Sequence, residues 1–357
     1  MSSSASHCYD AYAFFCKNTD LKSNGLGLEV VSAKRMYCKA NNDKGESMYL
    51  KRYGKILKSC SGNNGYFYAV KTLMDPSFGE IKPDFSYLPE KSWFLEFTLK
   101  LATPLICKDD ESFYVHDNPF HKDKVFKVPF YSASSWKGRL RWMAYKQWIA
   151  KGGKADERVA LGLLFGDETG EEDGSKFSAY LDECCPESKE KYRELVQALF
   201  DFEKNVESDD KKRKIPHHSG NLYFYPTFFY NLSQEVINPH DRKKKAGKNP
   251  IPIESVPQGS VGKFALLFAP INTGKKVYSS HDLYRDLRLV VSALHDILQS
   301  YGFGAKTSSG FGAVGEINQG IFQVKGIMNE IDFSGFNGLK GLPDKLEMIL
   351  KGGDAGV

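Results

Sequence analysis

The chain has 357 residues, 41% of them hydrophobic and 13% aromatic, which is enough for a sizeable core and too apolar for a disordered chain. Its 49 Lys and Arg against 44 Asp and Glu give a net charge of +5, an excess too small to identify a nucleic-acid partner by itself. No apolar run approaches the roughly 18 residues of a membrane helix, and the first residues lack a secretory signal, so we expect no membrane partner and a cytoplasmic protein.

The first part of the chain shows no clear period, and residues 1–91 are expected to form an N-terminal extension to which the sequence assigns no role. Short strands are expected within it at 26–33 and 65–73. The pattern sharpens at residues 93–102 (WFLEFTLKLA), which are rich in β-formers and alternate in part. They predict a strand that ends before Pro104, and a long polar connection follows.

A helix is predicted after this connection. Either Ser134 or Ser135 is expected to cap it, and large apolar residues recur at helical spacing until Gly152 and Gly153 end it. Further helical patterns, separated by a polar loop, predict a helical insertion at about 155–215.

Two strands and a long helix are predicted next. The aromatic segment 220–232 predicts a strand in which Pro226 marks an edge or a bulge. The apolar run 262–271 predicts a covered strand. An amphipathic helix is expected to begin at the serine pair 279–280, and a last strand is expected over 313–326.

The order of these elements defines the predicted fold. Between residues 92 and 326 the order is β-α-β-β-α-β, as in ferredoxin-like and RRM-like domains. We therefore predict an α+β domain over 92–326 that contains the helical insertion and a second large insertion, a loop at about 232–258. A C-terminal extension at 327–357 completes the chain. Fold alone does not give function, which has to come from side chains.

The predicted start of the first long helix is unusually basic. Lys137, Arg139 and Arg141 crowd its first turns, where the helix dipole already presents partial positive charge. A phosphate bound there would reverse the sign of that interaction, and the hydroxyls of Ser134 and Ser135 are possible donors to it. The alternative is a solvated basic surface.

A glycine-rich segment, GFGAKTSSGFG, lies between the last predicted helix and strand. Glycines allow backbone N–H groups to approach a phosphate closely, and a lysine supplies charge. It is not a Walker loop, because no helix follows it. A tight helix-to-strand turn is the alternative. The candidate phosphate-binding residues of this segment are Gly302, Gly304, Lys306, Thr307, Ser308, Ser309 and Gly310.

A third basic segment lies in the loop between the two strands, where Arg242, Lys243, Lys244 and Lys245 follow one another. A protruding basic loop can lie along a phosphate backbone, although such a run is more often solvated charge.

Three motifs together resemble the RAMP superfamily. The string VPFYSASSWKGRLR is similar to its S-S-x-K-G-x-x-R signature, although Ser132 and Ala133 stand where the family usually has Pro-Gly. LLFGD (163–167) is similar to the element that follows the signature helix, and GFGAKTSSGFG to the family's glycine-rich loop. The resemblance covers residues 92–326.

This resemblance implies a place in a type III CRISPR effector complex. The partners would be the CRISPR guide RNA, target RNA, other RAMP subunits and the large subunit. The signature helix and glycine-rich loop would grip the guide backbone, and the loop at 232–258 would act as a thumb that displaces a nucleotide. Such contacts read backbone and shape, while base pairing reads sequence.

Cleavage of target RNA is also implied. HDNPFHKD (116–123) is similar to the loop of catalytic members, in which Asp117 would be the key carboxylate and would help hold Mg²⁺ or Mn²⁺. His116 and His121 are possible helpers. The alternatives are an Asx turn at Asp117 in a non-catalytic capping subunit, and a metal-independent endonuclease that processes guide precursors.

Overall fold

The computed structural model describes residues 61, 66–68, 70–71, 82–109, 118–166, 176–200, 218–238 and 250–352. The expected strand at 26–33 lies outside these residues. The strand expected at 65–73 is wrong, because its described residues are helical.

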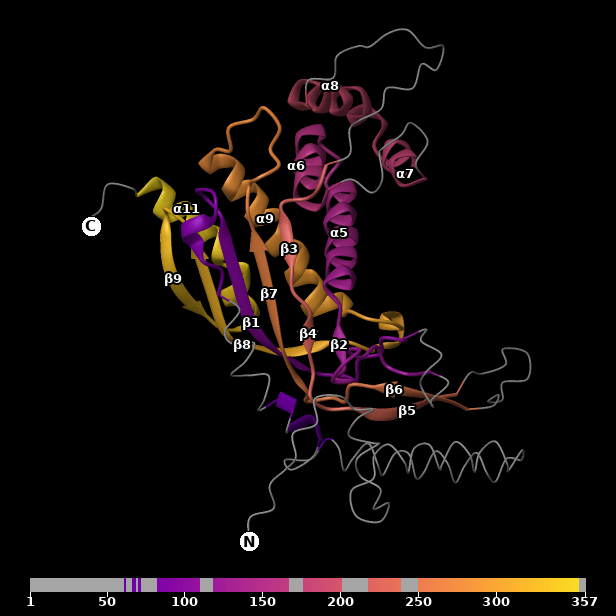
Figure 1. Cartoon of the computed structure of the whole chain (residues 1–357). Helices are drawn as coiled ribbons and strands as arrows, with labels where there is room; N and C mark the ends of the chain where they lie inside the picture. The colour runs from indigo at the N-terminus through magenta and orange to yellow at the C-terminus, as the bar shows by residue number, and fades with distance from the viewer. Residues whose placement is uncertain are drawn as a thin grey trace, which may run out of the picture.

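A five-stranded antiparallel sheet forms the centre of the fold (Figure 1). Its order is β3-β7-β1-β8-β9, and every neighbouring pair is antiparallel. Along the chain, the first four of these strands and the two longest helices follow one another as β1, α5, β3, β7, α9 and β8. The predicted α+β class is confirmed. The strands are β1 (Trp93–Leu101), β3 (Leu222–Phe224), β7 (Val261–Phe268), β8 (Val314–Val324) and β9 (Met328–Phe333).

The alternation in β1 separates its side chains between the two faces of the sheet. Phe97 packs in the main core beneath the helices, where its ring stacks on Phe264 of β7 with centroids 4.9 Å apart. Phe94 faces the other side, in a smaller cluster with Ala265 and Leu267. The residues of β1 in the main core are Trp93, Leu95, Phe97, Leu99 and Leu101.

Helices outside the helical insertion that contribute to the main core follow the sheet strands in the chain. They are α5 (Ala133–Ala150), α9 (Ser280–Asp296), α10 (Gly335–Lys340) and α11 (Leu342–Lys351). The start of α9 is confirmed, because Ser279 caps it and forms a capping box with Asp282. A five-residue π-helix, η3 (Ile297–Tyr301), continues α9, and Gly302 N donates to Ile297 O at 2.7 Å.

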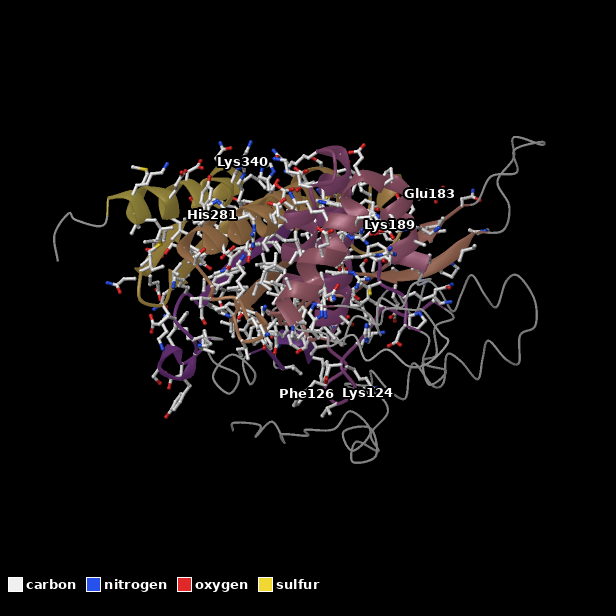
Figure 2. The ribbon with its side chains drawn as sticks, turned by 90° about the horizontal axis from the view of Figure 1, so that it is seen from above. Lys124, Phe126, Glu183, Lys189, His281 and Lys340 are labelled. Atoms are coloured by element: carbon white, nitrogen blue, oxygen red, sulfur yellow. The ribbon has the colours of Figure 1, made fainter. Side chains whose placement is uncertain are left out.

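The helical insertion lies beyond the C-terminal end of α5 (Figure 1). It contains α6 (Ala155–Phe165), α7 (Lys176–Cys184) and α8 (Lys189–Phe200). The buried guanidinium of Arg158 pairs with Asp182 at 2.6 Å and fixes α6 to α7. A cavity of about 430 Å³ opens between α7 and α8, and Figure 2 marks Glu183 and Lys189 of its lining.

Two short strand pairs lie outside the main sheet. Strand β2 (Phe130–Tyr131) pairs with β4 (Thr227–Phe228). Strands β5 (Ser233–Ile237) and β6 (Ile251–Ser255) form a hairpin that extends away from the sheet (Figure 1). Pro226 separates β4 from β3, an edge strand of the main sheet, as expected of a proline in this segment.

The C-terminal part of the sheet differs from the expectation. The strand expected to be last is β8, but β9 follows and pairs with it, so the sheet has a further strand. Half of the residues of β9 (MNEIDF) are polar and they do not alternate with the apolar ones, so the sequence did not distinguish this strand from a loop. The domain limits remain predictions. Within the described ranges, no helix is long and apolar enough to cross a membrane.

Candidate nucleic-acid interface

The cap of α5 is Ser132, not Ser134 or Ser135 as the sequence suggested. Ser132 has extended backbone (φ −70°, ψ 154°), and its Oγ accepts from Ser135 N at 3.1 Å. Its hydroxyl also donates to Ser135 Oγ at 2.8 Å. Because Ser132, the first serine of the run, lies one residue before the helix, Ser134 is left exposed at the first turn.

Helix α5 carries cations without acidic residues. Its sequence contains Lys137, Arg139, Arg141 and Lys146 and no Asp or Glu. Lys146 is exposed, and the guanidinium of Arg141 lies over the ring of Phe177, 5.2 Å from its centroid. The first two turns therefore combine the positive end of the helix dipole with the side chains of Lys137 and Arg139, an arrangement that an anion stabilises.

Arg139 joins α5 to the glycine-rich loop. Its Nε and Nη2 donate to the carbonyl oxygen of Gly302 at 3.1 and 2.8 Å, and Nη2 also donates to Tyr301 O at 3.2 Å. Burial lowers the pKa of the guanidinium, which nonetheless stays charged at neutral pH. Two motifs that lie more than 150 residues apart in sequence are thus held in direct contact.

Phe303 provides the apolar anchor of the same contact. Its fully buried ring packs on Trp136 of α5 and on Tyr131 of β2, with centroids 4.6 and 5.0 Å apart. Burial of this ring fixes the loop against the start of the helix.

Some glycines of the loop are required by backbone packing. Gly304 has φ +84°, and a Cβ there would lie 2.6 Å from Ile106 O. Gly312 has φ +73°, and its Cβ would lie 1.9 Å from Phe303 O. At these two positions a glycine is therefore required by the tight turn between helix and strand.

The middle of the loop is exposed. Lys306 has left-handed backbone (φ 57°), and a single 3₁₀ turn follows at Thr307–Ser309. Ser309 N donates to Lys306 O at 2.9 Å. The side chains of Lys306, Ser308 and Ser309 reach solvent, while Thr307 is half-buried and Gly310 has open space around it.

The loop that follows Asp117 is bound to the β5–β6 hairpin. Asn118 Nδ2 donates to Pro252 O at 3.1 Å, and Glu254 N donates to Asn118 O at 3.0 Å. The buried Glu254 carboxylate accepts from Phe120 N at 2.8 Å and pairs with Lys122. The hairpin and this loop therefore form one packed unit.

Only some of the predicted catalytic and thumb residues lie within the described part of the chain. Asp117, His116 and the basic run at 242–245 lie outside the described residues. His121 is described, and its ring lies against Phe130 with centroids 4.4 Å apart, while its backbone N donates to Cys107 O at 2.8 Å. Within the part of the chain that the structure describes, no group of three or more His, Cys, Asp or Glu is placed to hold a metal ion.

The LLFGD motif has a structural role in the described residues. Gly166 ends α6 with φ +75°, and a Cβ there would lie 2.6 Å from Gly220 N. The motif therefore allows two backbone segments to cross closely before β3.

Sequence reasoning missed an exposed aromatic pair beside this surface. Trp142 and Tyr301 are 44% and 39% exposed, and their rings meet edge to face with centroids 5.8 Å apart. A signal was present, because Trp142 lies off the apolar face of α5 that Leu140 and Met143 share.

A protein-family model and solved structures match this chain. No curated protein matches it. Among solved structures, a chain in the cryo-EM structure of the Type III-B Cmr-beta bound to cognate target RNA matches with a TM-score of 0.37 and 14% identity, over 90% of this chain and 87% of that chain. A model of the RAMP superfamily matches residues 98–315, more than half of the chain, including α5 and the glycine-rich loop.

Proposed function

The chain belongs to the RAMP superfamily, and on this basis we propose that it is a subunit of a type III CRISPR RNA-guided complex that holds the backbone of the guide RNA. The observation that carries the proposal is the contact of Arg139 with Gly302, because it unites the signature helix and the glycine-rich loop in one surface. Other RAMP subunits, the large subunit and the target RNA are the further partners that we propose.

Phosphate recognition is the chemistry that suits this surface. Ser134 at the first turn of α5 and the exposed turn at Lys306–Ser309 offer hydroxyls, backbone and an ammonium. Lys137 adds positive charge, and no acidic residue of α5 opposes it. Contacts of this kind position a nucleic acid without reading its sequence, so the bases of the guide remain available for pairing.

We further propose that the described sheet is a ferredoxin-like domain with insertions. Its element order, β1-α5-β3-β7-α9-β8, and its strand order support this assignment. In the same proposal, the β5–β6 hairpin is the base of a thumb, and the basic run at 242–245 belongs to its tip.

RNA binding by the full chain tests the main proposal. Affinity for a single-stranded RNA of guide length is measured over a range of salt concentrations for the wild type and for Lys137→Ala and Lys306→Ala. Each variant should bind more weakly and lose about 0.7 from the salt slope, as expected for one lost phosphate contact on a single strand.

Lys340→Ala is the matched control, because Lys340 is an exposed lysine on α10 (Figure 2) and lies in neither motif. It should leave both affinity and slope unchanged. Absence of RNA binding, or equal losses in all three variants, contradicts the proposal.

Cleavage of target RNA is a second candidate function. The observation that favours it is the attachment of Asn118 to Pro252 and Glu254, since it ties the residue after Asp117 to the proposed thumb. A divalent Mg²⁺ or Mn²⁺ ion would polarise the phosphate or activate the ribose hydroxyl. Asp117 is the residue proposed to help hold the ion, because HDNPFHKD is similar to the loop of catalytic RAMP members.

The assembled complex distinguishes cleavage from capping. Target RNA is incubated with wild-type complex or with Asp117→Ala complex, in magnesium and in chelator. Loss of one or more magnesium-dependent cuts, with guide binding retained, supports cleavage. An unchanged cut pattern contradicts it and leaves the chain as a guide-binding or capping subunit.

A further inference from the structure

Trp142 stands apart from the other tryptophans of the chain. Trp93, Trp136 and Trp148 are 0–1% exposed, whereas Trp142 is 44% exposed on the outer side of α5. A single exposed apolar residue needs no explanation, but Tyr301 is exposed beside it and extends the same surface.

Cations occupy the surface of this aromatic pair. Lys146 Nζ lies 5.0 Å from the ring centroid of Trp142 and 4.4 Å from that of Tyr301, and it donates to Tyr301 Oη at 3.2 Å. The Arg139 guanidinium lies 4.7 Å from the Trp142 centroid. Arg139 precedes Trp142 by three residues and Lys146 follows it by four, so the two cations flank the ring along the helix.

The aromatic pair is continuous with the proposed phosphate-binding surface. Tyr301 directly precedes Gly302, and its carbonyl oxygen accepts from the same Arg139 that holds the glycine-rich loop. An RNA strand whose backbone follows α5 and the glycine-rich loop would therefore bring its bases past Trp142.

We propose that Trp142 and Tyr301 form a stacking site for one unpaired base of the bound RNA. This inference rests on the proposed RNA-binding function and adds a base contact to it. A base stacked on an aromatic ring is stabilised more than an exposed ammonium over the same ring. The base therefore displaces the exposed Lys146, which turns to a neighbouring phosphate.

A protein partner is the competing occupant of this surface. The charge distribution favours RNA, because α5 presents four cations and no acidic residue. The nearby Asp296 is already hydrogen-bonded to Gln147, at 2.6 Å. Adjacent rings and cations are the combination with which proteins bind single-stranded nucleic acids.

Intrinsic fluorescence reports on this site directly. Because the other three tryptophans are buried, acrylamide quenches Trp142 selectively in the full chain. Full-length protein is titrated with a mixed-sequence single-stranded RNA and, separately, with a fully paired RNA duplex. Binding is followed in parallel by the anisotropy of a dye on the RNA. The single strand should quench Trp142 and protect it from acrylamide, whereas the duplex should do neither.

Substitutions separate stacking from folding. Trp142→Ala should weaken single-strand binding by about tenfold, which corresponds to the loss of one base stack. Trp142→Phe keeps a ring and should bind within about twofold of the wild type. Tyr87→Ala is the matched control, since Tyr87 is 87% exposed near the opposite face of the sheet, and it should change nothing.

The two proposals fail in different ways. If RNA binds while Trp142 emission and acrylamide access stay unchanged, the stacking site is refuted and the RNA-binding function stands. Equal quenching by single strand and duplex also refutes it. If anisotropy detects no RNA binding, the proposed function fails and the stacking site with it.

Discussion

The ammonium of Lys122 pairs with the carboxylate of Glu254, and both side chains are buried although they lie 132 residues apart in sequence. The pair joins the loop that follows Asp117 to strand β6. Phe120 N donates to the same carboxylate, so Glu254 binds both a backbone N–H and the Lys122 ammonium of this loop.

We predict that Lys122→Met and Glu254→Gln each destabilise the protein by about 3–5 kcal/mol, because each leaves one buried charge without its ion-pair partner. The double variant should lose less than the sum of the two. Denaturant unfolding of the four proteins gives the coupling energy. If each single variant lost less than about 1 kcal/mol and the double variant lost the sum of the two, the ion pair would be unimportant for stability.

Arg139→Ala should destabilise the protein by about 1.5–3 kcal/mol, since it removes charge-assisted hydrogen bonds to Gly302 and Tyr301. Arg139→Lys keeps the charge but lacks the planar fork, so it should recover only part of the loss. Lys137→Ala, which changes a cation of the same helix, serves as control and should stay within about 0.5 kcal/mol. If Arg139→Lys were as stable as the wild type, a positive charge at this position would be sufficient for stability, and the role of the planar guanidinium would be contradicted.

Gly312→Ala and Gly310→Ala form a matched pair in one loop. Both glycines have positive φ, but only at Gly312 would a Cβ meet backbone, at 1.9 Å from Phe303 O, whereas Gly310 has nothing within 4 Å. We expect a loss of about 1–2 kcal/mol for Gly310→Ala and about 3 kcal/mol or more for Gly312→Ala. Unfolding curves of both variants test the order, and similar losses would contradict this packing.

Asp286 should make stability fall as the pH rises. Burial raises its pKa from the ordinary 3.8 to about 6, although Arg285 and the Tyr278 hydroxyl act to lower it. The folded protein therefore keeps this proton between about pH 4 and pH 6 while the unfolded chain releases it, and folding free energy is lost over that interval.

Asp286→Asn should remove this part of the pH dependence. Unfolding free energies of the wild type and the variant, measured from pH 4 to pH 7, provide the comparison. The control is Asp282→Asn: burial acts to raise the Asp282 pKa, but hydrogen bonds from Lys276 and Ser279 outweigh it and lower the pKa, so its contribution is lost as the pH falls. Parallel curves for wild type and Asp286→Asn would contradict the prediction.

The long elements were predictable because their signals are local. The β-formers of β1 and the helical spacing of Trp136 and Leu140 each act within one element, and both elements formed where expected. The cap of α5 was misplaced by two residues or more, because Ser132, Ser134 and Ser135 are chemically alike and only backbone conformation separates them.

The parts that sequence could not predict depend on distant partners. Strands β5 and β6 have only five residues each, and they are held by pairing with each other and by the contacts of Glu254 with the loop at Phe120. Arg139 was recognised as a candidate phosphate ligand, but nothing local indicated that its guanidinium would hold Gly302. The catalytic role of the Asp117 carboxylate remains a prediction.

The π-helix at the end of α9 has a consequence for comparison across homologues. A π-turn contains one residue more than an α-turn and accommodates that residue locally. A single-residue deletion within Ile297–Tyr301 would therefore restore regular α-helix, while the residue before Gly302 would keep its place beside Trp142. Homologues with one residue fewer here can thus retain the aromatic pair, provided that the residue before the glycine is aromatic.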